Sequence, residues 1–262
     1  MVERSEMDEV LREEAEFANR DYAKHADDLE LKPRMWTRYA HPTELWDWRQ
    51  MAVVQLGDVA GKDMLDMGCG MGEESVYFAK LGAKVTGIDI AEVGIATLKR
   101  RAAHHNLAIS ALKMRADETT FPDNRFDLVH GLGILHHIGI AKGLAEVRRV
   151  LRPGGIGVFL EPMGNSPLIE VVKTWMLRRA MAFGGAVTHV TDHEENLKWK
   201  DIDAATRAFS EVRLYPYNLL FRARRLVPQV AYPLVHKLDF AVLNLAPALK
   251  RYAGAVVIRV RK

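Results

Sequence analysis

The chain has 262 residues, 48% of them hydrophobic and 27% charged, with a formal net charge of +3. This composition is typical of a globular protein, and the length suits one α/β domain with additions. The one cysteine, Cys69, excludes a disulfide framework and a thiolate metal cluster, and we expect no bound metal. No signal-peptide core and no apolar run long enough to span a membrane is found. These features predict a cytoplasmic protein.

The charge is unevenly distributed along the chain. Residues 1–30 carry 4 basic and 11 acidic residues, whereas residues 171–262 carry 16 basic and 7 acidic residues. An acidic N-terminal part and a basic C-terminal part favour contact with an anionic acceptor or a membrane surface. Solvated helix faces that differ in charge are the alternative interpretation.

In chain order, the first elements expected are helices over 7–31 and 45–56, with an aromatic stretch between them. From Lys62 onward, short apolar runs alternate with amphipathic segments, which is typical of βαβ units. The expected strands are 64–67, 84–89, 109–114, 126–131 and 156–160, and the expected helices are 73–81, 92–106 and 140–151. A turn at Arg152–Gly155 separates the last helix from its strand. Five buried strands with helical crossovers predict a parallel sheet covered on both faces.

The rest of the chain is less regular. A helix is expected over 168–183 and strands over 209–215 and 255–260, with the last two strands paired as a hairpin. This predicts a Rossmann-like, seven-stranded, mostly parallel α/β sheet with helices on both faces. The expected organisation is an N-terminal helical lid, 1–60, a main domain, 61–262, and within it a helical insertion, 217–250.

The most informative stretch runs from the first strand into the next helix as Leu-Asp-Met-Gly-Cys-Gly-Met-Gly-Glu-Glu, residues 65–74. Its glycines, Gly68, Gly70 and Gly72, allow a tight turn and a close approach to a ligand. A dinucleotide site would have a different glycine spacing and a phosphate at the helix start. Here Glu73 and Glu74 occupy that place and would repel a phosphate. The ligand is therefore expected to be cationic or zwitterionic, and S-adenosylmethionine fits.

Two further acidic positions support this ligand. Asp89 ends the second strand, where a carboxylate can accept hydrogen bonds from both hydroxyls of a ribose. Asp117 and Glu118 follow the third strand, where an acid can accept from an adenine amino group. The glycine-rich loop and these two acidic positions follow the first, second and third expected strands in turn, so together they predict a nucleoside-binding site.

The stretches LDMGCGMGEESVYFAKLGAKVTGIDI, ADETTFPDNRFDLVHGLGILHHI and RVLRPGG resemble the class I S-adenosylmethionine-dependent methyltransferases of the type 11 methyltransferase-domain group. The resemblance covers about residues 62–162. It implies that Asp66, Gly68 and Gly70 hold the methionine part and that Gly131 presents its carbonyl to the ammonium group, with Leu132 nearby. The cofactor-binding residues implied are Asp66, Gly68, Gly70, Gly72, Asp89, Ile90, Asp117, Glu118, Gly131 and Leu132.

The acceptor is expected beyond the carboxyl ends of the fourth and fifth strands, because ligands of open α/β sheets bind there. His136, His137, Glu161 and Asn165 arrive at this edge. Histidine can remove a proton from a hydroxyl acceptor near neutral pH, so His136, His137 and Glu161 are the catalytic candidates. A structural role for one histidine and a capping role for Glu161 are the alternatives.

Three other segments are candidates for covering the site. The aromatic residues of the N-terminal part could form a lid or belong to the core; they are Trp36, Tyr39, His41, Trp46 and Trp48. The loop Thr188–Glu195, with its two histidines and three acids, could close over the acceptor, lie on the surface or bind a metal. The insertion over 217–250 could roof the acceptor site, contact a membrane surface or form a homodimer contact.

The sequence thus predicts S-adenosylmethionine-dependent methyl transfer to a small-molecule acceptor by in-line displacement, with oxygen the favoured nucleophile. Methylation of a lipid- or glycan-linked acceptor at a membrane surface and a non-catalytic S-adenosylmethionine-binding partner subunit are the alternatives. Nucleic acid is not expected as a partner, because the segment after the fourth strand lacks the Asn/Asp-Pro-Pro-aromatic pattern of amino-methylating enzymes.

Overall fold

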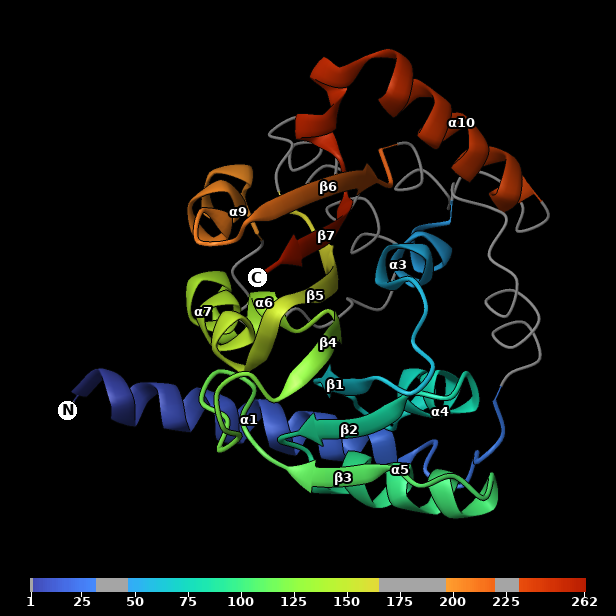
Figure 1. Cartoon of the computed structure of the whole chain (residues 1–262), viewed down its shortest axis with the longest axis vertical. Helices are drawn as coiled ribbons and strands as arrows, with labels where there is room; N and C mark the ends of the chain where they lie inside the picture. Colours follow the sequence, from blue (N-terminus) through green and yellow to red (C-terminus); the bar gives the residue numbers. More distant parts are fainter. Residues whose placement is uncertain (1, 32–46, 165–196, 220–230) are drawn as a thin grey trace, which may run out of the picture.

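The structure, a computed structural model, describes residues 2–31, 47–164, 197–219 and 231–262. Its centre is a seven-stranded sheet with the strand order β3-β2-β1-β4-β5-β7-β6 (Figure 1). The strands are β1 (Asp63–Met67), β2 (Lys84–Asp89), β3 (Ser110–Lys113), β4 (Phe126–Leu132), β5 (Leu151–Pro162), β6 (Glu211–Tyr217) and β7 (Ala255–Arg261). Strands β1 to β5 are parallel, and β7 is antiparallel to both β5 and β6. The predicted Rossmann-like sheet and its final antiparallel pair are confirmed.

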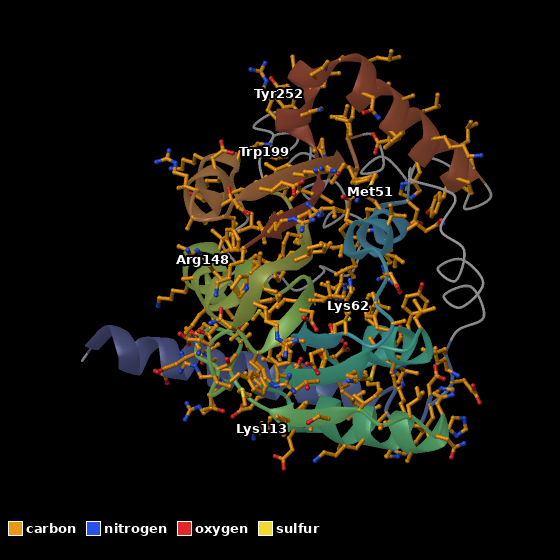
Figure 2. All side chains as sticks on the ribbon, in the orientation of Figure 1. Met51, Lys62, Lys113, Arg148, Trp199 and Tyr252 are labelled. Carbon is orange, nitrogen blue, oxygen red and sulfur yellow. The ribbon has the colours of Figure 1, made fainter. Side chains whose placement is uncertain are left out.

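Helices cover both faces of the sheet (Figure 1). The helices of one face are α3 (Trp48–Leu56), α4 (Glu73–Lys80) and α5 (Glu92–His104), and those of the other are α6 (Leu135–Ile138), α7 (Ile140–Val150) and α9 (Trp199–Thr206). Met51 of α3 and Trp199 of α9 lie on opposite sides of the sheet (Figure 2). The expected helix over 168–183 falls outside the described residues.

The alternation of side chains along each strand explains the two layers. Met64 packs into the core under α3 and α4, whereas Leu65 and Met67 pack into the core under α7. In the same way, Phe159 points to the opposite core from its neighbour Val158. Successive side chains of a strand point to opposite faces, so a strand that is apolar at every position needs a helix on each side.

One predicted turn is part of a strand instead. Residues Arg152–Gly155 lie within β5, but they interrupt its register: Leu151 is opposite Phe126, and Ile156 is opposite Leu128. Gly154 has a φ of 79°, and its N–H donates to the Lys262 carbonyl at 3.0 Å. The Pro-Gly-Gly segment therefore forms an irregularity in β5, because Lys262, the residue after β7, supplies hydrogen-bond partners that the sequence alone does not reveal.

The N-terminal helix α1 (Val2–Ala23) and the residues after it lie against α5. The Asn19 Oδ1 atom accepts a hydrogen bond from the Val93 N–H at 2.9 Å. The Arg101 side chain, 1% exposed, donates to the Asp28 carbonyl at 2.6 and 3.0 Å and to the Met71 carbonyl at 3.1 Å. Arg101 thus joins the segment after α1 to the glycine-rich loop.

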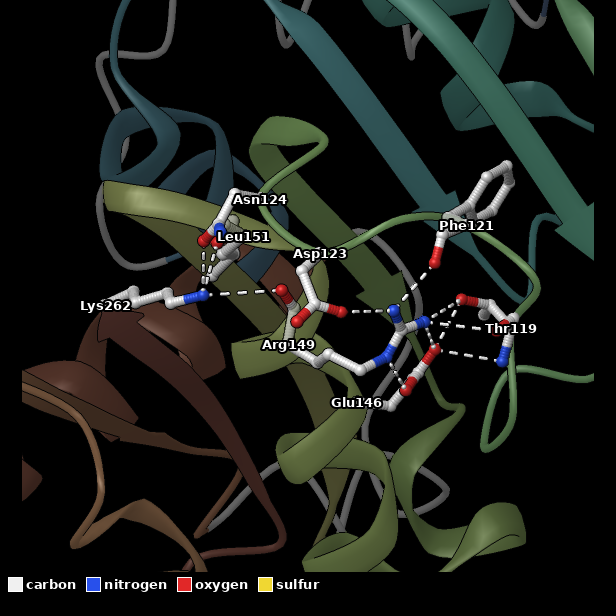
Figure 3. Close-up of polar contacts among 8 residues, drawn as sticks. All are labelled: Thr119, Phe121, Asp123, Asn124, Glu146, Arg149, Leu151 and Lys262. Atoms are coloured by element: carbon white, nitrogen blue, oxygen red, sulfur yellow. Dashed lines mark hydrogen bonds and ion pairs between the residues drawn. The ribbon is translucent and has the colours of Figure 1, made fainter.

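A polar network fixes the loop between β3 and β4 (Figure 3). The Arg149 guanidinium of α7 donates to Glu146 at 2.6 and 2.8 Å, to the Phe121 carbonyl at 2.7 Å and to Asp123 at 2.8 Å. Glu146 also accepts from both the N–H and the hydroxyl of Thr119. Burial by itself raises the pKa of Glu146, but the hydrogen bonds from Arg149 and Thr119 hold this pKa below its usual range.

The insertion between β6 and β7 is helical where it is described. It contains α10 (Tyr232–Leu245) and the 3₁₀ helix η3 (Pro247–Tyr252), which lie beyond β6 at the edge of the sheet opposite β3 (Figure 1). The Phe240 ring stacks on Tyr217 of β6 with centroids 6.2 Å apart. Among the described residues, every helix is too short or too polar to cross a bilayer.

Candidate functional site

Two adjoining cavities lie at the carboxyl ends of the central parallel strands. Their volumes are about 270 and 250 Å³, and both are lined by Tyr22, Gly68 and Leu132, so they form one continuous site. The larger cavity is also lined by Asp89, Ile90, Met114, Arg115, Ala116, Asp117, Ile134, His137 and Ile138 and by the α1 residues Leu11, Glu14, Phe17, Ala18 and Asp21. The smaller cavity adds the glycine-rich loop, Cys69 to Glu74, with Arg49, Asp66 and His130. The predicted glycine loop and strand-end acids therefore do come together.

The glycine-rich loop needs glycine for conformation and for space. Gly68, Gly70 and Gly72 have φ values of 71°, 51° and 82°, a region that favours glycine. A Cβ atom on Gly72 would lie 2.3 Å from the Leu98 Cδ1 atom, which belongs to a fully buried side chain. The loop thus packs directly on α5, which allows α4 to begin at Glu73 beside the cavity.

Beneath this loop, Asp66 is buried and its two oxygens have partners inside the protein. The Ser75 hydroxyl donates to Oδ2 at 2.5 Å, and the His130 Nδ1 atom lies 2.9 Å from Oδ1. Cys69 lies in the same loop, and burial raises the pKa of its thiol well above the usual value. Its thiol is therefore protonated at neutral pH, which agrees with its interpretation as a small buried side chain.

The smaller cavity is rich in carboxylates. Three acidic residues, Asp66, Glu73 and Glu74, line it, against one arginine, Arg49. Arg49 lies 3.7 Å from Glu74, and burial raises the pKa of Glu74. This arrangement suits a ligand with an ammonium or sulfonium group and disfavours a phosphate, because excess negative charge attracts the former and repels the latter. The donor set fits S-adenosylmethionine.

Asp89 of β2 lines the larger cavity and contacts the glycine-rich loop. Its Oδ2 atom accepts from the Gly70 N–H at 2.9 Å, and its Oδ1 atom accepts from the Ala91 N–H at 2.7 Å. Burial raises the pKa of Asp89. Burial also raises the pKa of Tyr22, and the nearby negative charge of Asp89 raises it further. The carboxylate is held rigidly, and its remaining lone pairs are at the cavity wall, where a ribose hydroxyl could donate.

The acid after the third strand is also in the site, but its neighbour is not. Asp117 lines the larger cavity and is held by two hydrogen bonds from Arg115, at 2.9 and 3.1 Å. Glu118 is exposed and lines neither cavity. Gly131 also lies outside both linings, buried between the side chains of Ile134 and Phe159. The roles assigned to Glu118 and Gly131 stay predictions without support from the cavity geometry.

Among the acceptor-side candidates, Glu161 and His136 form a buried pair. The Glu161 side chain is fully buried; its Oε1 atom accepts from the Ile134 and Leu135 N–H groups, both at 2.9 Å. Its Oε2 atom lies 2.8 Å from the His136 Nδ1 atom. His136 lies next to Gly133, which lines the larger cavity. The His136 Cε1 atom is 3.6 Å from the position that a Cβ atom on Gly133 would occupy. Glu161 itself is inside the protein and lines neither cavity, so its catalytic role stays a prediction.

His137 differs from His136 in its surroundings. It lines the larger cavity, and its Nδ1 atom lies 3.2 Å from the Glu14 Oε1 atom of α1. The two imidazole rings are 4.1 Å apart. The structure therefore places His137 in the lining of the larger cavity and His136 beside it, and the two rings contact separate carboxylates.

Residues 1–60 were expected to form a lid, but the sequence did not indicate which residues of α1 line the larger cavity. Leu11, Ala18 and Tyr22 recur at positions that share one face of a helix, and this spacing is the signal that could have marked them. Trp48, expected in a lid, packs at the start of α3 against the sheet core. The expected lid residues Trp36, Tyr39, His41 and Trp46 fall outside the described residues, as do Asn165 and the loop over 188–195.

The mostly parallel sheet, the glycine-rich loop and the acidic cavity point to the class I S-adenosylmethionine-dependent methyltransferases. A family model described as "Methyltransferase domain" matches residues 64–155. A ubiquinone biosynthesis O-methyltransferase of Pseudomonas aeruginosa is 31% identical over 156 residues, which cover 58% of this chain and 67% of that protein. The chain belongs to this family of methyltransferases, and S-adenosylmethionine is its cofactor.

Solved structures agree on the fold. A phosphoethanolamine N-methyltransferase of Haemonchus contortus in complex with S-adenosylmethionine superposes with a TM-score of 0.58 at 20% identity, over 83% of this chain and 52% of that chain. The cyclase SpnF superposes with a TM-score of 0.55 at 19% identity, over 81% of this chain and 80% of that chain. Because one of these proteins is named as a cyclase, the fold alone does not define the acceptor.

Proposed function

We propose that this methyltransferase acts on a hydroxyl oxygen of a small-molecule acceptor and that His136 is the base that removes the hydroxyl proton. The relative named as an O-methyltransferase supports an oxygen acceptor. When bound, S-adenosylmethionine supplies an electrophilic methyl group on a sulfonium. In our proposal the carboxylates of the smaller cavity hold its charged groups, and Asp89, Ile90 and Asp117 hold the adenosine.

The contact between His136 and Glu161 carries the proposal. Both Glu161 oxygens act as acceptors, since Oε1 already takes two backbone N–H groups and Oε2 faces the imidazole at 2.8 Å. The His136 Nδ1 atom therefore carries the proton that it donates, which leaves a lone pair on Nε2. A histidine held in this tautomer by a buried carboxylate can accept a proton from a hydroxyl without first changing its own protonation state.

The experiment compares two variants of neighbouring histidines. Methyl transfer from labelled S-adenosylmethionine is measured against a panel of small phenols and catechols as probe acceptors. His136→Ala should lower kcat by about 10²–10⁴-fold, the usual contribution of a general base. His137→Ala is the matched control, because its ring lies beside His136 but contacts Glu14. We expect a smaller effect on kcat there.

Calorimetry of S-adenosylmethionine binding completes this test. The affinity of His136→Ala should equal that of the unmodified chain, because His136 lines neither cavity. Full turnover of His136→Ala would contradict the assignment of the base. Transfer to amines but to none of the hydroxyl compounds would contradict the assignment of the oxygen.

A further inference from the structure

Helix α10 exposes a row of apolar side chains on its outer face. Leu234, Leu238 and Leu245 are 61%, 50% and 86% exposed, and Ala241 is exposed between them. Their spacing of four, three and four residues places them on one side of the helix. The opposite side is in contact with the protein, where Leu243 is 2% exposed and Phe240 stacks on Tyr217. Side chains of this helix project away from the rest of the molecule (Figure 2).

Such a row is unusual for a helix at a water-exposed sheet edge. Single exposed leucines are common, but leucines aligned along one face form a patch that favours contact with another apolar phase. Neither cavity is lined by a described residue of α10 or η3, so the row is separate from the cofactor site.

Basic residues outnumber acids in α10 and η3. Residues 232–252 contain three Lys and Arg residues, Lys237, Lys250 and Arg251, and a single acid, Asp239. Asp239 is 2% exposed, so its charge is withdrawn from the surface, whereas Lys237 and Arg251 are exposed. Lys237 lies within α10 beside Leu238, and Arg251 lies in η3 next to its last residue, Tyr252, which is labelled in Figure 2. The described surface of α10 and η3 is therefore apolar and cationic.

We propose that α10 and η3 form a docking surface for an anionic lipid bilayer, with the leucine row in the interfacial region and the basic residues at the headgroups. An amphipathic helix with this pairing of leucine and basic residues partitions into the plane of a membrane surface. A second copy of the chain is a poorer occupant, because it would bring two cationic faces together. The inference does not depend on the acceptor or on His136.

The test measures binding of the 262-residue chain to phosphatidylcholine vesicles with and without phosphatidylglycerol, by flotation at low and high salt. We expect binding to the anionic vesicles and a decrease as salt screens the basic residues. Leu238→Glu should weaken this binding roughly tenfold or more, since it removes apolar burial and adds an opposing charge. Lys237→Gln should weaken it about fivefold, the effect of one basic residue near an anionic surface.

Leu112→Glu is the matched control. Leu112 is 38% exposed on β3, at the other edge of the sheet, so the same substitution there should leave vesicle binding unchanged. Calorimetry with S-adenosylmethionine shows that each variant is folded, and His136→Ala should bind vesicles normally even if the proposed base is wrong.

Three outcomes would overturn the proposal. The first is a lack of binding to anionic vesicles by the unmodified chain. The second is equal loss of binding in Leu112→Glu and Leu238→Glu. The third is a dimer that Leu238→Glu dissociates in sedimentation velocity while vesicle binding stays unchanged, which would make the row a contact between copies of the chain.

Discussion

The region around β1 and β2 and the region beyond β6 differ in how they place charge. Around β1 and β2, carboxylates are buried and held by internal hydrogen bonds, as in the Asp66–Ser75 and Asp89–Gly70 contacts. Beyond β6, the one acid of α10 is buried and basic side chains are exposed. Buried carboxylates held in place by hydrogen bonds form a cavity that favours a small cationic ligand. Exposed basic side chains next to apolar ones suit contact with a large, deformable surface.

This comparison predicts that a glycine substitution in the glycine-rich loop lowers the free energy of unfolding more than one far from the cofactor site. Gly72→Ala should reduce the free energy of unfolding by about 3 kcal/mol for two reasons. The new Cβ atom would lie 2.3 Å from the Leu98 side chain, and the alanine backbone would have to adopt a φ of 82°. Gly154→Ala, far from the cofactor site, is the control; it has a similar φ of 79° but no atom within 4 Å of its Cβ. We expect a loss of about 1 kcal/mol there. Urea denaturation measures both, and equal losses would contradict the role of the Leu98 contact.

The second prediction concerns the strand-end acid. Asp89→Ala should weaken S-adenosylmethionine binding by about 20–100-fold, because it removes a charged acceptor and the partner of the Gly70 N–H. Asp203→Ala, an exposed acid of α9, should have no effect in the same calorimetric titration. Because the pKa of Asp89 is raised, affinity should also begin to fall on acidification above the usual aspartate range. An unchanged affinity in Asp89→Ala would exclude it from the site.

The third prediction tests the contact between α1 and the glycine-rich loop. Arg101→Met should cost about 2 kcal/mol in stability and also weaken cofactor binding, because the Asp28 and Met71 carbonyls lose their donor. Arg100→Met is the matched control, since the neighbouring Arg100 is exposed and contacts Asp27 at the surface. If both variants bind S-adenosylmethionine equally well, then the position of α1 does not depend on Arg101.

The smallest expected effect concerns the network around Arg149. The folded-state pKa of Glu146 is lowered, so its contribution to stability is present above its unfolded pKa of about 4.3 and is lost as the pH falls through the folded value. Glu146→Gln should therefore lose about 1 kcal/mol near neutral pH and show a flatter decline of stability below about pH 4.3. Denaturation curves across this range measure it, and parallel curves for both proteins would contradict the assignment.

The sequence predicted the first five strands because short apolar stretches alternate with helices that have a clear period. It also indicated the glycine loop, Asp89 and Asp117, whose residue types are tied to short local geometry. It did not indicate Arg101 or Tyr22, because an arginine and a tyrosine on charged helices give no sign of burial. Their roles arise from contacts with residues far away in the chain.

The sequence by itself determined the order of strands and helices, the class of cofactor and the excess of basic residues near the end of the chain, since each depends on neighbouring residues. Only the tertiary structure decided that α1 forms a wall of the larger cavity, that Glu161 is buried against His136 and that the leucines of α10 face outward. The physical reason is that burial and hydrogen bonding are set by which surfaces meet when distant segments pack together.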